Sequence, residues 1–369
     1  MRIYILLVLL ALTFASCQRN APHVNSFYYW KLGHENDSDR LQRFNELKVE
    51  HLYVHYMDVD WSEGLKMPVP KATASIADDS SFTSRPITPV IFITNRVFER
   101  MTDAWCDTLA EKLSKKISLI TYSFYKNRIE RSKLDPNIPY NDDYAHVVDS
   151  YQRVKVQPVL DTLKEIQIDC DWTAKTKDKY FRFLKKFKQK YPHQQISVTV
   201  RLYPYKYPKA MGVPPVDRGV LMCYNLGGLQ KAKTANSIFS TGELKQYLNA
   251  KKYPLPLDIA LPIFGWYAWF SNNTFKGIIY EQPSLVDNAA FKREDGGNYR
   301  VKADTVVQYK YLREGDVLRM EYPEAKDIVN AAQLVTDKVP DYGKIIFYHW
   351  DNNLIHKYEN TIKGVYNNY

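Results

Sequence analysis

The sequence predicts a (β/α)8 barrel, a closed ring of eight parallel strands with helices outside it, and a β-rich insertion between the seventh and eighth strands. Three observations lead to this prediction. Eight short runs rich in Val, Ile, Tyr and Phe occur along the chain, helical patterns separate several of them, and no Gly/Ser linker or repeat divides the 369 residues. Strands that alternate with helices pair in parallel and pack their helices outside, and eight such units fit one barrel.

The expected strands all lie in the barrel domain, residues 25–369. They are residues 26–31, 51–58, 87–94, 166–172, 195–202, 219–225, 257–264 and 344–350. The clearest helical patterns are residues 39–48, 103–118, 174–191 and 325–335. Each strand-like run is short and rich in β-branched and aromatic residues, which favour a pleated, buried surface.

Two connections are long. One covers residues 95–165, between the third and fourth strands, and the other covers residues 265–343, between the seventh and eighth. The second contains strand-like runs at residues 277–280 and 299–311. We therefore expect a small β-rich insertion, about residues 265–340, over the barrel mouth, where long loops usually bind substrate.

The first 16 residues have the features of an export signal. Arg2 is followed by an uncharged run, residues 3–14, and then by two small residues before Cys17. The apolar run is shorter than the roughly 20 residues that a membrane span needs. The alternative to a lipoprotein signal is a plain secretory signal with a chance cysteine at this position.

The segment Phe14-Ala15-Ser16-Cys17 resembles the bacterial lipobox, although Phe14 stands where Leu is usual. This resemblance implies that Cys17 is lipidated and that residues 17–24 form a tether. The protein would then be a membrane-anchored lipoprotein of the bacterial cell envelope, on the periplasmic side or at the cell surface.

The net charge and the spacing of the cysteines argue against nucleic-acid-binding, metal-binding and disulfide-rich classes of protein. The net charge is +10, but many lysines lie between apolar positions of the expected helix 174–191, as on a solvated face, so we expect no nucleic-acid partner. Cys106, Cys170 and Cys223 lack metal-ligand spacing and are too scattered for a disulfide framework, which favours buried free thiols. We expect no metal, no cofactor and a monomer.

The fourth expected strand carries the strongest candidate for chemistry. Strand side chains alternate, so Gln167, Asp169, Asp171 and Thr173 should share one face. Carboxylates on the inner face of a barrel carry a desolvation cost, and two neighbouring acids repel, which raises one pKa and can prepare a general acid. The alternative is a strand end where the acids cap the next helix and meet solvent.

Three motifs occur at the ends of expected strands: Asp-x-Asp on the fourth strand, the Met-Cys-Tyr-Asn run of residues 222–225 on the sixth, and Trp350 on the eighth. Together they resemble the family 18 glycoside hydrolases, the chitinases and endo-β-N-acetylglucosaminidases. In that family a Glu protonates the glycosidic oxygen while the N-acetyl group of the substrate attacks the anomeric carbon. The resemblance implies a TIM barrel that acts on an amino-sugar glycan.

The resemblance also assigns roles to individual residues. Asp171 would orient the acetamido group, Asp169 would support it, Tyr224 would bond its oxygen, and Trp350 would stack under the sugar. Other expected substrate-binding residues lie beside these on the same strands: Met222, Asn225, Gln167 and Tyr348.

The chain departs from the family at two positions, and the departures leave two functions open. Thr173 stands where the family has its Glu, and Asn225 replaces an Asp. The protein is therefore either a lipid-anchored glycoside hydrolase-like barrel with its acid elsewhere, or a non-catalytic carbohydrate-binding lipoprotein. The acids that could replace the Glu are Asp171, Asp58, Asp60, Asp351 and Glu281.

The aromatic residues support sugar binding in both cases, because aromatic faces stack on the C–H faces of sugar rings. The chain holds 29 Tyr and 7 Trp, many of them at the ends of expected strands. After the seventh strand, Trp266, Tyr267, Trp269 and Phe270 form either a sugar platform or a clamp between barrel and insertion. We expect His55 and His349 to be hydrogen-bonded core residues rather than bases or metal ligands.

Overall fold

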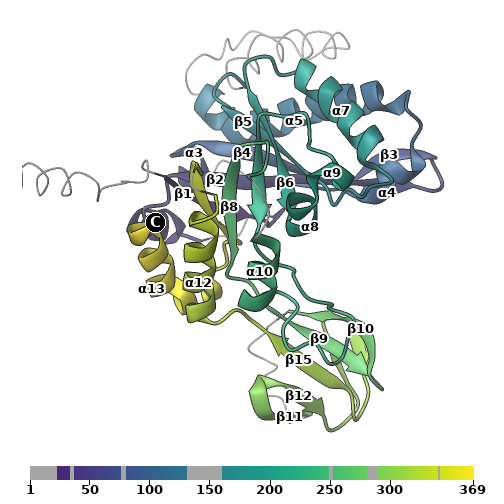
Figure 1. The fold of residues 1–369 in the computed structure, drawn as a ribbon, viewed down its shortest axis with the longest axis vertical. Helices are drawn as coiled ribbons and strands as arrows, with labels where there is room; N and C mark the ends of the chain where they lie inside the picture. Colours follow the sequence, from purple (N-terminus) through teal and green to yellow (C-terminus); the bar gives the residue numbers. More distant parts are fainter. Residues whose placement is uncertain are drawn as a thin grey trace, which may run out of the picture.

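The computed structural model describes residues 23–33, 37–75, 80–130, 160–248, 252–280, 289–339 and 341–369. Eight parallel strands form a closed barrel, because β16 pairs with both β8 and β1, and β1 pairs in turn with β2 (Figure 1). The strands are β1 (Val24–Tyr29), β2 (His51–Ser62), β4 (Ile87–Ile93), β5 (Glu165–Asp169), β6 (Gln195–Arg201), β7 (Arg218–Met222), β8 (Leu257–Pro262) and β16 (Lys344–Tyr348). The expected (β/α)8 barrel is confirmed.

Helices cover the outside of the barrel. Helices α5 and α7 pack together on one side, and α12 and α13 on another (Figure 1). The helices are α2 (Arg40–Glu46), α3 (Ser80–Thr83), α4 (Asn95–Arg100), α5 (Trp105–Glu130), α7 (Lys177–Gln189), α8 (Leu202–Lys206), α9 (Pro208–Met211), α10 (Thr241–Leu248), α12 (Ala325–Thr336) and α13 (Asn352–Asn368). In α7 the buried side chains recur at helical spacing and the lysines lie between them, as the sequence predicts.

Most of the barrel strands end one to three residues earlier than their sequences predict. β5 ends at Asp169, β7 at Met222 and β16 at Tyr348, although the aromatic runs continue beyond each of them. Several elements were not expected: the strand β3 (Met67–Thr73), which pairs antiparallel with β2, and the helices α3, α4, α8, α9, α10 and α13. The early strand ends matter for function because the candidate residues lie there.

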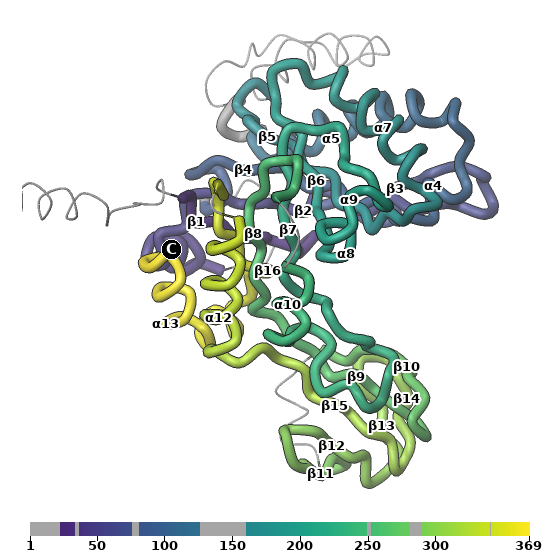
Figure 2. The backbone as a smooth tube through the Cα atoms, viewed as in Figure 1, coloured from purple at the N-terminus to yellow at the C-terminus, as the bar shows by residue number. Residues whose placement is uncertain are grey.

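The insertion after β8 is a separate antiparallel layer (Figure 2). Its five-stranded sheet has the order β10-β9-β15-β12-β11, and a two-stranded hairpin, β13–β14, lies beside it. The strands are β9 (Trp266–Ser271), β10 (Thr274–Ile279), β11 (Phe291–Arg293), β12 (Tyr299–Val301), β13 (Thr305–Val307), β14 (Lys310–Leu312) and β15 (Val317–Glu321). The insertion has its own apolar core, which includes Tyr267, Ile279 and Leu318.

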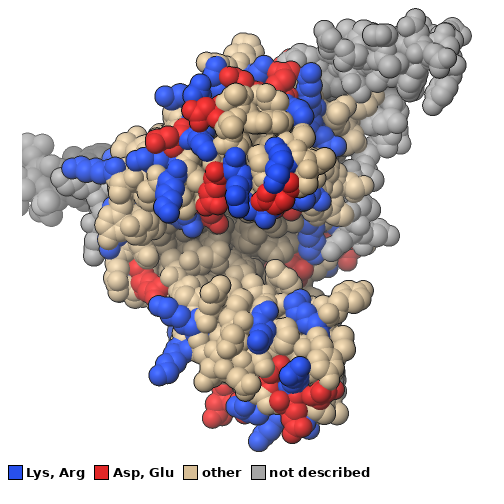
Figure 3. All heavy atoms as spheres, turned by 90° about the vertical axis from the view of Figure 1, so that its right-hand side faces the viewer, with Lys and Arg blue, Asp and Glu red and all other residues tan. Residues whose placement is uncertain are grey.

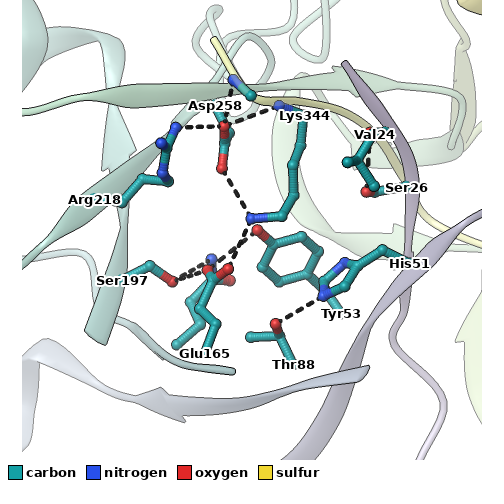
Figure 4. Close-up of polar contacts among 12 residues, drawn as sticks. Val24, Ser26, His51, Tyr53, Thr88, Glu165, Ser197, Arg218, Asp258 and Lys344 are labelled. Atoms are coloured by element: carbon teal, nitrogen blue, oxygen red, sulfur yellow. Dashed lines mark hydrogen bonds and ion pairs between the residues drawn. The ribbon is translucent and has the colours of Figure 1, made fainter. Parts of the chain in front are cut away.

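The amino-terminal end of the barrel is closed by a buried network of charges (Figure 4). The Lys344 ammonium lies 2.8 Å from Glu165 Oε2 and 3.4 Å from Asp258 Oδ2, and Arg218 Nη1 lies 2.8 Å from Asp258 Oδ1. Glu165 also accepts hydrogen bonds from the hydroxyls of Tyr53 and Ser197. Polar groups at this end of a (β/α)8 barrel generally serve stability.

Within the described ranges, no helix is both long and apolar enough to cross a membrane. The expected export signal, the Cys17 lipidation site and nearly all of the expected tether lie outside the described residues.

Candidate functional site

A cavity of about 750 Å³ opens at the carboxyl ends of the barrel strands, on the side that carries the insertion. Figure 3 shows a hollow of mainly uncharged surface between the barrel and the smaller lobe below it. The lining residues are Tyr28, Trp30, Asp169, Thr199, Met222, Tyr224, Asn225, Phe264, Gly265, Trp266, Tyr280, Tyr322, Tyr348, His349, Asp351, Asn353, Leu354 and Lys357. A (β/α)8 barrel places its active site at this end.

The floor of the cavity is a group of aromatic rings centred on Tyr348. Its ring stacks on Tyr224 with centroids 5.3 Å apart, and meets Phe264 and Tyr28 edge to face at 5.2 and 5.6 Å. Burial raises the pKa of Tyr28, Tyr224 and Tyr348 well above the usual tyrosine value. These hydroxyls therefore stay neutral at ordinary pH and can act as hydrogen-bond donors.

Asp169 brings a carboxyl group to this aromatic floor. Its side chain is buried and accepts a hydrogen bond from Thr199 Oγ1 at 2.5 Å. Burial, reinforced by the negative charge of Asp171, raises the pKa of Asp169 to about 7, although the Thr199 bond opposes the shift. The carboxyl group is thus divided between its neutral and charged forms near pH 7, as a proton donor or a neutral hydrogen-bond donor requires.

Trp30, at the end of β1, forms part of the cavity wall and is fixed from behind. Its indole stacks on the His55 ring at a centroid distance of 4.3 Å and an angle of 5°. His55 Nε2 lies 2.7 Å from Asp58 Oδ1, and His55 Nδ1 lies 3.3 Å from the Trp30 carbonyl oxygen. The expectation that His55 is a hydrogen-bonded core residue agrees with this geometry.

The insertion contributes a second wall. Trp266 lines the cavity, and its Nε1 donates to Glu321 Oε2 at 3.0 Å. Glu321 is fully buried and also bonds Arg319 and Ser237, the latter in the connection that follows β7. Trp266 therefore serves both as cavity wall and as clamp, whereas Tyr267 and Phe270 are buried within the insertion.

The start of α13 supplies further polar groups. Asp351 accepts hydrogen bonds from the backbone amides of Asn353 and Leu354, and its Oδ2 lies 3.1 Å from the Lys31 ammonium. Lys357 lies over the Tyr322 ring, with Nζ 4.0 Å from the centroid. Asp351 is therefore occupied by its own helix and by Lys31, in contrast to Asp169.

The structure brings five of the predicted site residues together around this cavity: Asp169, Met222, Tyr224, Asn225 and Tyr348. Gln167 lies one layer below the floor. It accepts a hydrogen bond from the Tyr28 hydroxyl at 2.7 Å and donates to Ser197 Oγ at 3.3 Å. Gln167 thus positions Tyr28 and is fully buried, so a ligand in the cavity does not reach it.

Asp171 and Thr173 do not line the cavity, so Asp171 does not join Asp169 there as expected. The strand ends at Asp169, and buried Trp172 anchors the following turn by donating its Nε1 hydrogen to the Met211 carbonyl oxygen at 3.1 Å. Asp171 is left half-exposed, 3.1 Å from Arg201 Nε. The Thr173 hydroxyl lies 3.2 Å from that of Thr176, where the next helix starts.

Trp350 also lies away from the cavity, although its backbone amide still bonds the Tyr28 carbonyl oxygen of β1. Its side chain is buried outside the barrel, edge to face with Phe27 at 5.0 Å and with Phe44 of α2 at 4.3 Å. The physical reason is that β16 ends at Tyr348, so the inward alternation does not continue to Trp350. The aromatic residue of β16 that faces the cavity is Tyr348.

Sequence reasoning missed several lining residues, above all Tyr28, Trp30 and Thr199. A signal was present for two of them, because Tyr28 and Trp30 are two residues apart on the first strand and therefore share a face.

The other acids that were candidates for the proton donor lie elsewhere. Asp58 is hydrogen-bonded to His55, and Asp60 accepts a hydrogen bond from the Thr94 hydroxyl at 2.5 Å. Glu281 lies outside the described residues.

Within the part of the chain that is described, no cluster of three or more His, Cys, Asp or Glu side chains could hold a metal ion. Cys106, Cys170 and Cys223 are buried free thiols, as expected.

Known proteins match this chain in fold but not in sequence. No family model matches the sequence, and no curated protein matches it. Among solved structures, the Bacillus cereus spore cortex-lytic enzyme SleL matches with a TM-score of 0.46 at 13% identity, covering 93% of this chain and 74% of that one. A fungal endo-β-N-acetylglucosaminidase from glycosyl hydrolase family 18 matches with a TM-score of 0.40 at 7% identity, covering 93% and 96%.

A xylanase-α-amylase inhibitor protein also matches, with a TM-score of 0.43 at 10% identity and coverage of 93% and 99%. A family 18 protein is thus among the solved structures to which this chain is similar.

Proposed function

We propose that the cavity binds a glycan that contains amino sugars. The observation that carries this proposal is an aromatic-lined cavity of about 750 Å³ with one buried, largely unpaired carboxyl group at its floor, that of Asp169. Aromatic faces such as those of Trp30 and Tyr348 stack on the C–H faces of sugar rings. Neutral tyrosine hydroxyls and the Asn225 amide supply the few polar contacts that fix the orientation of a ligand.

Binding without cleavage is the function that the positions of the acids support best. Family 18 enzymes use a Glu at the position of Thr173, and here that hydroxyl faces Thr176 rather than the cavity. Two carboxyl groups lie among the described lining residues, and one of them, Asp351, is already bonded to Lys31 and to its own helix. Asp169 is left without a second free carboxylate beside it, so the usual two-carboxylate schemes lack a partner.

Hydrolysis is the second candidate, and one observation favours it. A pKa of about 7 makes Asp169 a competent proton donor near neutral pH. Substrate-assisted cleavage needs only one protein acid, because the substrate's N-acetyl group serves as the nucleophile. In this case Asp169 itself would protonate the glycosidic oxygen.

Calorimetric titration of the purified chain with N-acetylglucosamine oligomers, beside glucose oligomers, tests the proposal. Trp30→Ala should weaken binding at least about tenfold, the usual effect of removing a central aromatic contact. Trp105→Ala removes a similarly half-buried Trp outside the cavity and should leave the affinity unchanged. The proposal fails if the wild type binds no amino-sugar glycan, or if both variants bind equally well.

Release of reducing ends from the same oligomers separates the two candidates. A wild type that binds but releases none is a binding protein. Release that disappears in Asp169→Asn, while oligomer binding persists, would make the protein an enzyme with Asp169 as its acid.

We also propose that Cys17 carries a lipid that holds the protein at a membrane of the cell envelope. The support is the sequence alone: a short apolar run followed by Ala15, Ser16 and Cys17. Cys17→Ser should move the protein from the membrane fraction to the soluble fraction and abolish labelling by radioactive palmitate. A wild type that takes up no fatty acid would contradict the proposal.

A further inference from the structure

The hairpin β13–β14 of the insertion has an unusual turn. Its two tip residues, Gln308 and Tyr309, both have positive φ angles, 48° and 61°. Two-residue hairpin turns of this kind strongly prefer Asn and Gly, because other side chains are strained in the left-handed region. Here the turn holds a Tyr, whose side chain is fully exposed.

The hairpin is apolar on both faces. Val307 and Leu312 point into the core of the insertion. On the opposite face Val306 and Tyr311 are direct cross-strand partners, and both are more than half exposed. Only one apolar face is needed for packing, so the exposed one is available for a ligand.

The tip of the hairpin is bonded to the cavity wall. The Gln308 side chain accepts a hydrogen bond from the Tyr280 amide at 3.1 Å and donates one to the Tyr280 carbonyl oxygen at 2.7 Å. Tyr280 lines the cavity and is 59% exposed. The hairpin tip is therefore fixed beside Tyr280 at the rim of the cavity, and Tyr309 and Tyr311 are one and three residues beyond Gln308.

The charges beside this surface favour a neutral partner. The Tyr311 hydroxyl donates to Asp304, which also accepts from the Glu314 amide at 2.8 Å. Arg313 adjoins Glu314 in the sequence and Lys310 adjoins Tyr311, so neither sign of charge dominates. An anionic lipid surface or a nucleic acid needs an excess of positive charge, whereas exposed tyrosines among mixed charges suit sugar rings.

We propose that Tyr280, Tyr309 and Tyr311 form an outer contact surface for a long glycan chain whose end or middle occupies the cavity. This inference rests on the proposed glycan binding, and it specifies the substrate class as a polymer rather than a mono- or disaccharide. The cavity binds the inner sugar units, and the hairpin binds units several positions further along.

The experiment compares ligands of two lengths. The double variant Tyr309→Ala/Tyr311→Ala should lose about tenfold in affinity for an N-acetylglucosamine hexasaccharide and keep its affinity for the disaccharide. Val329→Ala, which removes an exposed apolar side chain from the outer face of α12, should change neither affinity. Equal loss for both ligands, or no loss for either, overturns the outer contact surface and leaves the glycan-binding cavity in place.

A wild type that binds neither ligand overturns the proposed function itself, and the outer surface with it. Sedimentation with anionic lipid vesicles that is lost in the double variant, while hexasaccharide affinity is unchanged, would reassign the hairpin to a membrane contact and also overturn the inference.

Discussion

The two ends of β5 carry carboxyl groups in opposite situations. Glu165 and Asp169 are four residues apart, are both buried, and both point into the barrel. Burial would raise the pKa of Glu165, but Lys344 and His51, with hydrogen bonds from Lys344 and Ser197, lower it below its usual value. Burial raises the pKa of Asp169 to about 7, because Thr199 donates its one hydrogen bond and no described ion pair reaches it.

This difference separates the parts of the barrel that serve stability from those that serve function. At the amino-terminal end the charges neutralise one another within the protein. No ligand is needed to balance them. At the carboxyl end, the Asp169 carboxyl group is buried and forms no ion pair among the described residues. A buried group in that condition costs stability, and such groups are concentrated at functional sites.

The largest effect is expected for Lys344→Met. The substitution leaves Glu165 and Asp258 buried without their shared cation, and breaking a buried ion pair on one side typically costs 3–5 kcal/mol. Urea unfolding of both chains measures the change. Lys326→Met, at an exposed lysine paired with Glu324, should have no measurable effect. Equal stability of Lys344→Met and the wild type would show that the amino-terminal network is dispensable.

The next prediction concerns how stability depends on pH. The pKa of Asp169 is about 7 in the folded chain and about 3.9 in an unfolded one, so the folded state binds more protons between these values. The contribution of Asp169 is therefore favourable at low pH and declines as pH rises, by about 3 kcal/mol from pH 5 to pH 8.

Asp169→Asn removes this dependence. Relative to the wild type, the variant should gain stability on going from pH 5 to pH 8, as measured by urea unfolding at both values. If the free energy of unfolding changed equally with pH in both chains, Asp169 would be charged at both pH values. The contrast between Asp169 and Glu165 would then disappear.

A smaller effect is expected for Thr199→Val. The hydroxyl of Thr199 stabilises the charged form of Asp169, so its removal should raise the pKa of Asp169 further, by about one unit or 1.4 kcal/mol. NMR titration of the Asp169 carboxyl carbon measures the shift. A lowered pKa would reverse our assignment of Thr199 as the donor.

The smallest effect is expected for Asp171→Asn. The Asp171–Arg201 pair is about half-exposed, and such pairs contribute roughly 0–1 kcal/mol to stability. Glycan affinity should stay within about twofold of the wild type because the Asp171 side chain does not line the cavity. A large loss of binding or turnover would mean that Asp171 contributes to the site as Asp169 does.

The barrel and its insertion could be predicted because each depends on local periodicity. The strand runs are continuous and apolar as buried parallel strands require, and those of residues 277–280 and 299–311 indicated the antiparallel layer correctly. The inward position of Asp169 also followed from alternation. All of these inferences use residues that lie within one element.

The prediction failed where a strand ends. Alternation placed Asp171 and Trp350 inside the barrel, but β5 and β16 end two residues before them. Burial of Trp172, the pairing with Arg201 and the packing of Trp350 on Phe44 decide their orientation, and these partners come from other elements. No sequence pattern near Asp171 or Trp350 contains that information.

The first residue of β1 and the mouth of the cavity lie at opposite ends of the barrel. Cys17 is seven positions before Val24, and a chain of that length reaches at most about 25 Å. A lipid on Cys17 would therefore hold the charged, closed end of the barrel towards the bilayer and direct the open end outwards. In that orientation the cavity would face material that arrives from the surroundings.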